Sequence, residues 1–394
     1  MRRAVAVLAL LAAFPVWAQV SEQKVKAYAR SYISYAPASV FTVTENTEGS
    51  TPAGPYQAVR LERTCIKPEA KDPVALLFDT RAGIVASGLL FPLPATEPPV
   101  TPDTLPLFVE QVLPQVLTNW FNNKVKVPWP MSPTKPGAVI PLVAQVSTGY
   151  GWMRMPLAIT GDGKYLMLGA CWPLDRDPRA VRREILERAE IQWDPDHEGA
   201  RVKVVEFSDF QCPGCKMGWG TVKPILTTFG DKVRHGIVTF PLVSLHPWAF
   251  RAAVAGYCIG TFWPDKVVEL KEECYRLQET LTVETLDDMV LGFLGARGLD
   301  KAKFTGCYLK DPSVDAVLHH LDLGYTLGVL GTPTFFVNGE PVAWGEGEWF
   351  SKRVEAILAA NGIPEGAAEI TVKPPTPIPS PTQRAGAKPA GAGT

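Results

Sequence analysis

The spacing of apolar and polar residues changes near residue 198 and divides the chain into two parts. In the second part a β-branched run, a helical period and another apolar run follow one another, which predicts a strand, a helix and a strand. Asn338-Gly339 lies between two further apolar runs, a strong signal for a β-hairpin. The expected elements are strands at 202–207, 233–241, 334–337 and 341–344, and helices at 213–229, across 246–327 and at 348–360.

Two stretches of the first part resemble each other. Short apolar runs lead from Gly83 to Gly88 and from Gly163 to Gly169, and each is preceded by an alternating stretch and a helical period, at 22–35 or 107–123. We interpret residues 19–98 and 99–178 as tandem α+β modules, each a helix packed on a small antiparallel sheet. Chance similarity of two hairpins is the alternative. Residues 179–198 predict a linker that is helical as far as Trp193.

The two ends of the chain differ from the rest in composition. Arg2 and Arg3 precede an apolar run at 4–14 and small residues before Ala18, which predicts a signal peptide at 1–18 and a periplasmic or other extracytoplasmic location. A membrane anchor is the alternative, but the run is shorter than the roughly 20 residues that a spanning helix needs. Residues 363–394 are rich in Pro, Ala and Gly, which predicts a disordered tail.

The net charge of −1 over 394 residues argues against a general binder of nucleic acid or of membrane surfaces. The chain has seven cysteines, an odd number, so at least one is unpaired if the others form disulfides. Cys65 and Cys171 lie in different modules, and a disulfide between them would staple the modules together. The alternative is that the cysteines outside the close pair described next are buried as small apolar side chains.

Cys212 and Cys215 are three residues apart, where the strand at 202–207 gives way to the helix at 213–229. Disulfide exchange requires a thiolate, and the helix N-terminus favours the anion at Cys212. Pro213 suits the first helical turn because its missing N–H is no loss there. We expect Cys212 to be the nucleophile and Cys215, one turn further in, to be the resolving thiol.

Two other sites complete the expected chemistry. Glu206 lies on the strand that leads to the dithiol, where burial would raise its pKa and let it accept the Cys215 proton through a water. A solvent-facing acid at the strand end is the alternative. Pro333 directly precedes a strand, and a cis bond after Thr332 would expose the Thr332 backbone to an extended peptide. A trans proline in a turn is the alternative.

These residues carry a family resemblance. The run from Val204 to Lys216, followed far along the chain by Gly331 to Gly339, resembles the thioredoxin superfamily, and within it the exported Dsb-type thiol-disulfide oxidoreductases. The resemblance spans residues 199–362 and implies an α/β thioredoxin-like fold with a helical insertion at about 243–327. It assigns the nucleophile to Cys212, the resolving thiol to Cys215, the cis-proline to Pro333 and the buried acid to Glu206.

The resemblance also implies partners and a second disulfide. The expected partners are cysteine-containing protein substrates and a membrane or soluble redox partner that resets the dithiol, and no cofactor beyond the redox-active disulfide is expected. Some relatives carry a disulfide between helices of the insertion, which implies Cys258 with Cys307; Cys274 with Cys307 is the rival pairing. Residues 160–169 resemble part of the dimerisation domain of disulfide isomerases, which suggests a homodimer.

Two other kinds of cysteine site do not fit the sequence. A structural zinc site needs two close ligand pairs, and only one exists; c-type haem attachment needs a histidine where Lys216 stands. We expect His246 to cap a helix or face solvent, with a place in the active-site groove as the alternative, and His319 and His320 to be exposed. The sequence leaves the direction open between oxidase, isomerase and reductase. From a different class, the alternative function is a chaperone-like binding module or a thiol-metal (copper) carrier.

Overall fold

The computed structural model describes residues 19–32, 39–66, 69–94, 104–117, 124–128, 137–345 and 347–360. The expected signal peptide at 1–18 and the expected tail at 363–394 lie outside these residues. Within the described part of the chain, no helix has both the length and the apolar character needed to cross a membrane.

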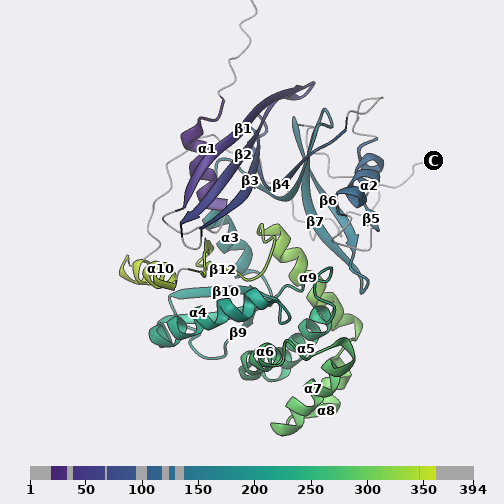
Figure 1. The fold of residues 1–394 in the computed structure, drawn as a ribbon, viewed down its shortest axis with the longest axis vertical. Coiled ribbons are helices and arrows are strands. Elements are labelled where there is room, and N and C mark those ends of the chain that lie inside the picture. Colours follow the sequence, from purple (N-terminus) through teal and green to yellow (C-terminus); the bar gives the residue numbers. More distant parts are fainter. Residues whose placement is uncertain are drawn as a thin grey trace, which may run out of the picture.

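The N-terminal part is built on one antiparallel sheet of eight strands (Figure 1). Its strand order is β1-β2-β3-β4-β8-β7-β6-β5. The strands are β1 (Val40–Thr51), β2 (Gly54–Ile66), β3 (Glu69–Asp79), β4 (Ile84–Pro92), β5 (Val125–Lys126), β6 (Val139–Ser147), β7 (Trp152–Thr160) and β8 (Tyr165–Pro173). Helix α1 (Glu22–Tyr32) precedes the first four strands and α2 (Leu105–Val116) precedes the last four.

The two similar stretches meet at the centre of this sheet. Gly88 of β4 is paired directly with Gly169 of β8, and both have positive φ angles, +157° and +151°. A Cβ on Gly88 would lie 1.9 Å from the Leu168 carbonyl oxygen, and one on Gly169 would lie 2.1 Å from the Ser87 carbonyl oxygen. Only glycine fits such an approach of two backbones, which explains why both stretches have glycine at this point.

Because β4 pairs with β8, the prediction of two separate small sheets was wrong: the strands of both stretches form one continuous sheet. The disulfide proposed between Cys65 and Cys171 is also contradicted, since Cys171 is a free thiol. Cys171 pairs with Ala86, and this row of the sheet reaches β2 at Ala58, seven residues from Cys65. Seven strand residues span roughly 23 Å, far beyond disulfide reach.

The linker differs from its prediction in its second half. Helix α3 (Pro178–Glu187) ends before residue 193, and β9 (Gln192–Trp193) pairs with the C-terminal sheet. Arg182 of α3 is fully buried and donates hydrogen bonds to the carbonyl oxygens of Ser31, Tyr32 and Leu327. The linker therefore joins the two parts through buried contacts.

The C-terminal part has a five-stranded sheet in the order β13-β12-β10-β11-β9. Its strands β10 (Val202–Ser208) and β11 (Val233–Thr239) are parallel, and α4 (Pro213–Phe229) connects them. The predicted hairpin is confirmed: β12 (Thr334–Val337) and β13 (Glu340–Val342) pair around a turn in which Asn338 and Gly339 both have positive φ. Helices α4 and α10 (Gly347–Ala359) bury apolar side chains against this sheet.

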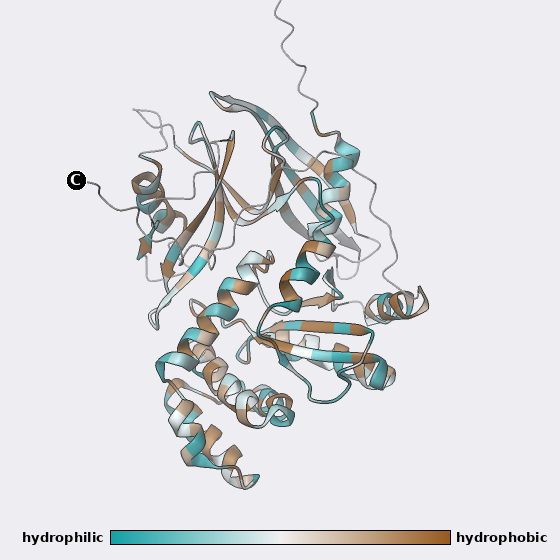
Figure 2. Cartoon of the chain, turned by 180° about the vertical axis from the view of Figure 1, so that it is seen from behind, coloured by the Kyte–Doolittle hydropathy of each residue, from teal (hydrophilic) through white to brown (hydrophobic). Residues whose placement is uncertain are grey.

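The predicted helical insertion lies between β11 and β12. It contains α5 (Ala249–Phe262), α6 (Val267–Arg276), α7 (Val283–Ala296), α8 (Lys301–Cys307) and α9 (Asp311–Thr326). These helices are banded brown and teal in Figure 2, as expected where one side of each turn is buried. A disulfide joins Cys258 to Cys307 with a Cα–Cα distance of 5.9 Å, the pairing that the resemblance implied.

The insertion also contacts the N-terminal sheet. Tyr150 stacks on Phe250 with ring centroids 4.1 Å apart, and Arg154 forms an ion pair with Asp322 of α9 at 2.9 Å. His320 of α9 is buried, with Nδ1 2.9 Å from the Thr239 hydroxyl, so its expected exposure was wrong, whereas His319 is exposed.

Candidate active site

Cys212 lies at the N-terminal end of α4, as its N-cap residue, and Pro213 begins the helix. Its thiol is almost fully buried and lies 3.5 Å from the carbonyl oxygen of Thr332. A hydrogen bond from the Cys215 thiol lowers the pKa of Cys212 to about 6, although burial opposes the shift. At neutral pH this thiol is therefore mostly ionised.

Cys215 has the opposite character. Its side chain is fully buried within the first turns of α4, and burial raises its pKa well above the usual value. The backbone N–H of Asp209 donates to its sulfur at 3.4 Å. One reactive thiolate therefore lies beside one protonated thiol, which is the asymmetry that a nucleophile and a resolving cysteine require.

Pro333 and Thr332 lie against this pair. The peptide bond between them is cis. Pro333 packs on α4 at Gly218, where a Cβ would come within 2.8 Å of the proline ring. The glycine lets the loop from the far end of the chain approach the helix, and this places the Thr332 carbonyl beside Cys212.

Glu206 is fully buried, so its alternative placement at a solvent-facing strand end was wrong. The expected direction of its pKa was also wrong. Burial alone would raise the pKa, but the Lys271 ammonium at 2.7 Å and His235 at 3.0 Å outweigh it and hold the pKa at about 2. Glu206 therefore stays ionised at neutral pH and is poorly suited to accept a proton.

Lys271 was not among the predicted site residues. It comes from α6 of the insertion, is fully buried, and lies 3.3 Å above the ring of Trp219. Burial lowers its pKa, and its charge interacts favourably with a Cys215 thiolate. One turn later on α6, the Tyr275 hydroxyl lies 2.9 Å from the Ser208 hydroxyl. The helical period of this segment predicts a helix, but it does not indicate that Lys271 pairs with Glu206, 65 residues earlier in the chain.

Asp209 and Gln211 were also missed. The Asp209 carboxylate is fully buried and accepts hydrogen bonds from the backbone N–H of Leu242 at 2.9 Å and from Nδ1 of His246 at 2.6 Å. Gln211 accepts one from the Trp248 N–H at 2.8 Å. His246 thus lies in the site, as its alternative placement had it, and the favoured capping or solvent-facing role was wrong.

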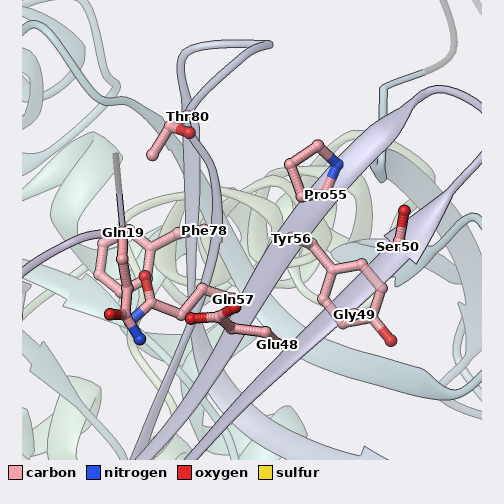
Figure 3. Close-up of a pocket in the computed structure, with 9 residues that line it drawn as sticks. All are labelled: Gln19, Glu48, Gly49, Ser50, Pro55, Tyr56, Gln57, Phe78 and Thr80. Carbon is pink, nitrogen blue, oxygen red and sulfur yellow. The ribbon is translucent and has the colours of Figure 1, made fainter. Parts of the chain in front are cut away.

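Other places in the described residues offer less chemistry. No group of three His, Cys, Asp or Glu side chains in that part of the chain converges as metal ligands. A cavity of about 280 Å³ lies on β1, β2 and β3 of the N-terminal sheet and contains no cysteine (Figure 3). The side chain of Gln57, which lines it, accepts a hydrogen bond from the Val20 N–H at 2.9 Å and donates one to the Val20 carbonyl oxygen at 3.2 Å.

The C-terminal part of the chain is similar to known proteins. Residues 197–356 match the family model described as Thioredoxin. Among curated proteins, the chain is 29% identical over 164 residues to the Na(+)/H(+) antiporter NhaA of Herminiimonas arsenicoxydans, covering 42% of this chain and 24% of that protein. It is 34% identical over 160 residues to Na(+)/H(+) antiporter NhaA 1 of Mycobacterium sp. (strain KMS), covering 39% and 24%. The chain thus matches about a quarter of the length of these relatives.

Two solved structures are similar to less than half of the chain. Proteus mirabilis ScsC in a transitional conformation is 18% identical and covers 46% of this chain and 80% of that one, with a TM-score of 0.37. Wolbachia pipientis alpha-DsbA1 is 17% identical and covers 45% and 96%, with a TM-score of 0.39. The predicted fold class is confirmed by the family match. Residues 197–356 match the Thioredoxin family model and form a thioredoxin-like domain with a helical insertion between β11 and β12.

Proposed function

We propose that this protein is an exported thiol-disulfide oxidoreductase that exchanges disulfides with protein substrates through Cys212 and Cys215. The observation that supports it best is the asymmetry of the pair: an ionised thiol beside Thr332 and a protonated thiol behind it. Its substrates are cysteine-containing polypeptides, and a membrane or soluble redox partner resets the pair.

The exchange takes place in two steps. The Cys212 thiolate attacks one sulfur of a substrate disulfide, forms a mixed disulfide and releases the other substrate sulfur as a thiolate. Cys215 then loses its proton and attacks Cys212, which closes the Cys212–Cys215 disulfide and releases the second substrate thiolate. The reverse sequence donates the disulfide to a substrate dithiol.

The buried charges act on the second step. Lys271 stabilises the Cys215 thiolate as it forms, and Glu206 acts as the fixed counter-charge of Lys271. The Thr332 carbonyl supplies a backbone acceptor for an extended substrate strand next to the reacting sulfur.

The test is reduction of insulin by dithiothreitol. We expect the wild-type protein to accelerate it and Cys212→Ser to fall to the rate without protein; equal rates for the two would refute the proposal. Cys215→Ala should accumulate a mixed disulfide with the substrate, because nothing then resolves it. Titration of the pair against glutathione would give the direction, and the molecular mass in solution would test the homodimer.

A chaperone-like role is the second candidate. Met217 on α4 and Leu245, in the loop held by Asp209, expose 61% and 67% of their surface. Exposed apolar side chains near the dithiol suit non-native polypeptides. Suppression of aggregation of a cysteine-free client that survives unchanged in Cys212→Ser would support this role.

A further inference from the structure

Asp209 and Gln211, which shortly precede Cys212, fasten a distant loop to the dithiol. Asp209 uses both carboxylate oxygens: Oδ1 accepts from the Gln211 N–H at 2.7 Å, and Oδ2 accepts from Leu242 at 2.9 Å and from His246 at 2.6 Å. Gln211 holds the N–H of Trp248, two residues beyond His246. The loop that carries His246 is therefore fixed at both ends, at Leu242 and at Trp248, and the His246 ring is fixed by Asp209.

Asp209 also touches the dithiol through its backbone. Its N–H donates to the Cys215 sulfur at 3.4 Å, and its carbonyl oxygen accepts from the Cys212 N–H at 3.0 Å. The carboxylate is fully buried, so its charge is little screened by water. A buried anion at this place raises the pKa of both cysteines and opposes the Cys212 thiolate.

His246 is the basic side chain that contacts the Asp209 carboxylate. Its side chain is 17% exposed and donates from Nδ1 to Asp209. That hydrogen bond raises its pKa, so the ring is more readily protonated. The titratable groups that face it are Asp209, from the end of β10, and Cys212, from the start of α4.

We propose that His246 is a positioning residue of the thiol exchange: held by Asp209, it carries the charge that offsets this buried carboxylate and stabilises the Cys212 thiolate. This role rests on the proposed function, in which Cys212 is the nucleophile, and the hydrogen bonds of Asp209 to His246 and to the Cys212 N–H support it. The proton stays on His246 during the attack, while the negative charge leaves with the substrate sulfur. Since the cation stabilises the reduced pair, it makes the disulfide a stronger oxidant.

The experiment compares His246→Gln with wild type by the ultraviolet absorbance of the thiolate against pH, and by equilibrium with glutathione. We expect the pKa of Cys212 to rise and the equilibrium constant for oxidising glutathione to fall about tenfold, equivalent to about 30 mV. His246→Lys keeps the charge and should stay close to wild type. His319→Gln, an exposed histidine on α9, is the matched control.

An unchanged thiolate titration and an unchanged glutathione equilibrium in His246→Gln would overturn the inference, as would a shift of the same size in His246→Lys. A second measurement does not depend on substituting His246: by NMR, the His246 ring should titrate at higher pH in the reduced wild-type protein than in Cys212→Ser. Failure of the proposed function would appear as no insulin reduction by wild type, whereas failure of this inference leaves that activity intact.

Discussion

The C-terminal domain has two cysteine pairs that can each form a disulfide, but the two pairs lie in different surroundings. Cys212 and Cys215 lie at a helix N-terminus, close to the buried side chains of Asp209 and Lys271. Cys258 lies fully buried in the main apolar core and is bonded to Cys307 at the end of α8.

The difference shows what makes a disulfide reactive. A thiolate at Cys212 accepts a hydrogen bond from the Cys215 thiol, which lowers its pKa, so reduction leaves a stabilised anion. An apolar core offers no such stabilisation, and reduction there removes a cross-link between residues 49 apart in sequence. We therefore expect one pair to govern exchange and the other to govern stability.

The largest effect on stability should come from removing the core disulfide. For Cys258→Ala with Cys307→Ala, the closed loop of about 50 residues predicts a loss of about 4 kcal/mol in the free energy of unfolding. Urea unfolding measures it. Insulin reduction by the folded variant should stay within about twofold of wild type.

Cys274 provides the control for this prediction. It is a free, fully buried thiol on α6, and Cys274→Ala should keep the disulfide and most of the stability. A loss from Cys274→Ala as large as that of the double variant would favour the rival pairing with Cys307. Loss of exchange activity in the folded double variant would break the division of roles.

The next effect should come from the buried charges beneath the dithiol. Lys271→Met leaves Glu206 ionised, buried and without its closest cation, and we expect a loss of about 3 kcal/mol in the free energy of unfolding. Lys271→Met combined with Glu206→Gln removes both charges and should recover much of that loss. If the double variant is as unstable as Lys271→Met alone, the loss comes from the packing of the Lys271 side chain and not from the unpaired charge of Glu206.

The same buried pair shows how far sequence reasoning extends. The dithiol and the hairpin at Asn338-Gly339 follow from local patterns, whereas strand alternation alone leaves open whether Glu206 is buried or faces solvent. The low pKa of Glu206 depends on Lys271, which a helix of the insertion brings to it from 65 positions along the chain. Local periodicity gives no information on such a pairing.

The N-terminal part shows a second kind of limit. Similar stretches were detectable, because both need glycine where two backbones meet. Whether their strands form two sheets or one depends on pairing between β4 and β8, which lie far apart in sequence. Strand alternation specifies which face is buried but not which strand is the neighbour.

The smallest effect should be a dependence of stability on pH that only the reduced protein shows. Cys212 has a pKa of about 6 in the fold and roughly 8.5 when unfolded. A lowered pKa stabilises the fold above the unfolded value, and this contribution is lost as pH falls through about 6. The raised pKa of His246 acts in the opposite direction, since its contribution is lost as pH rises, but it does so in both redox forms.

The quantity to measure is therefore the difference in free energy of unfolding between the reduced and the oxidised protein, in which most of the His246 contribution cancels. From pH 6 to pH 7 it should shift in favour of the reduced form by at most ~1 kcal/mol, the change that pKa values of about 6 in the fold and roughly 8.5 when unfolded allow over this range. Reduced Cys212→Ser lacks the titrating thiol and should show no such rise over this range. A flat difference in wild type would mean that Cys212 is not ionised in the fold, and the contrast between the reactive pair and the core pair would then need another cause.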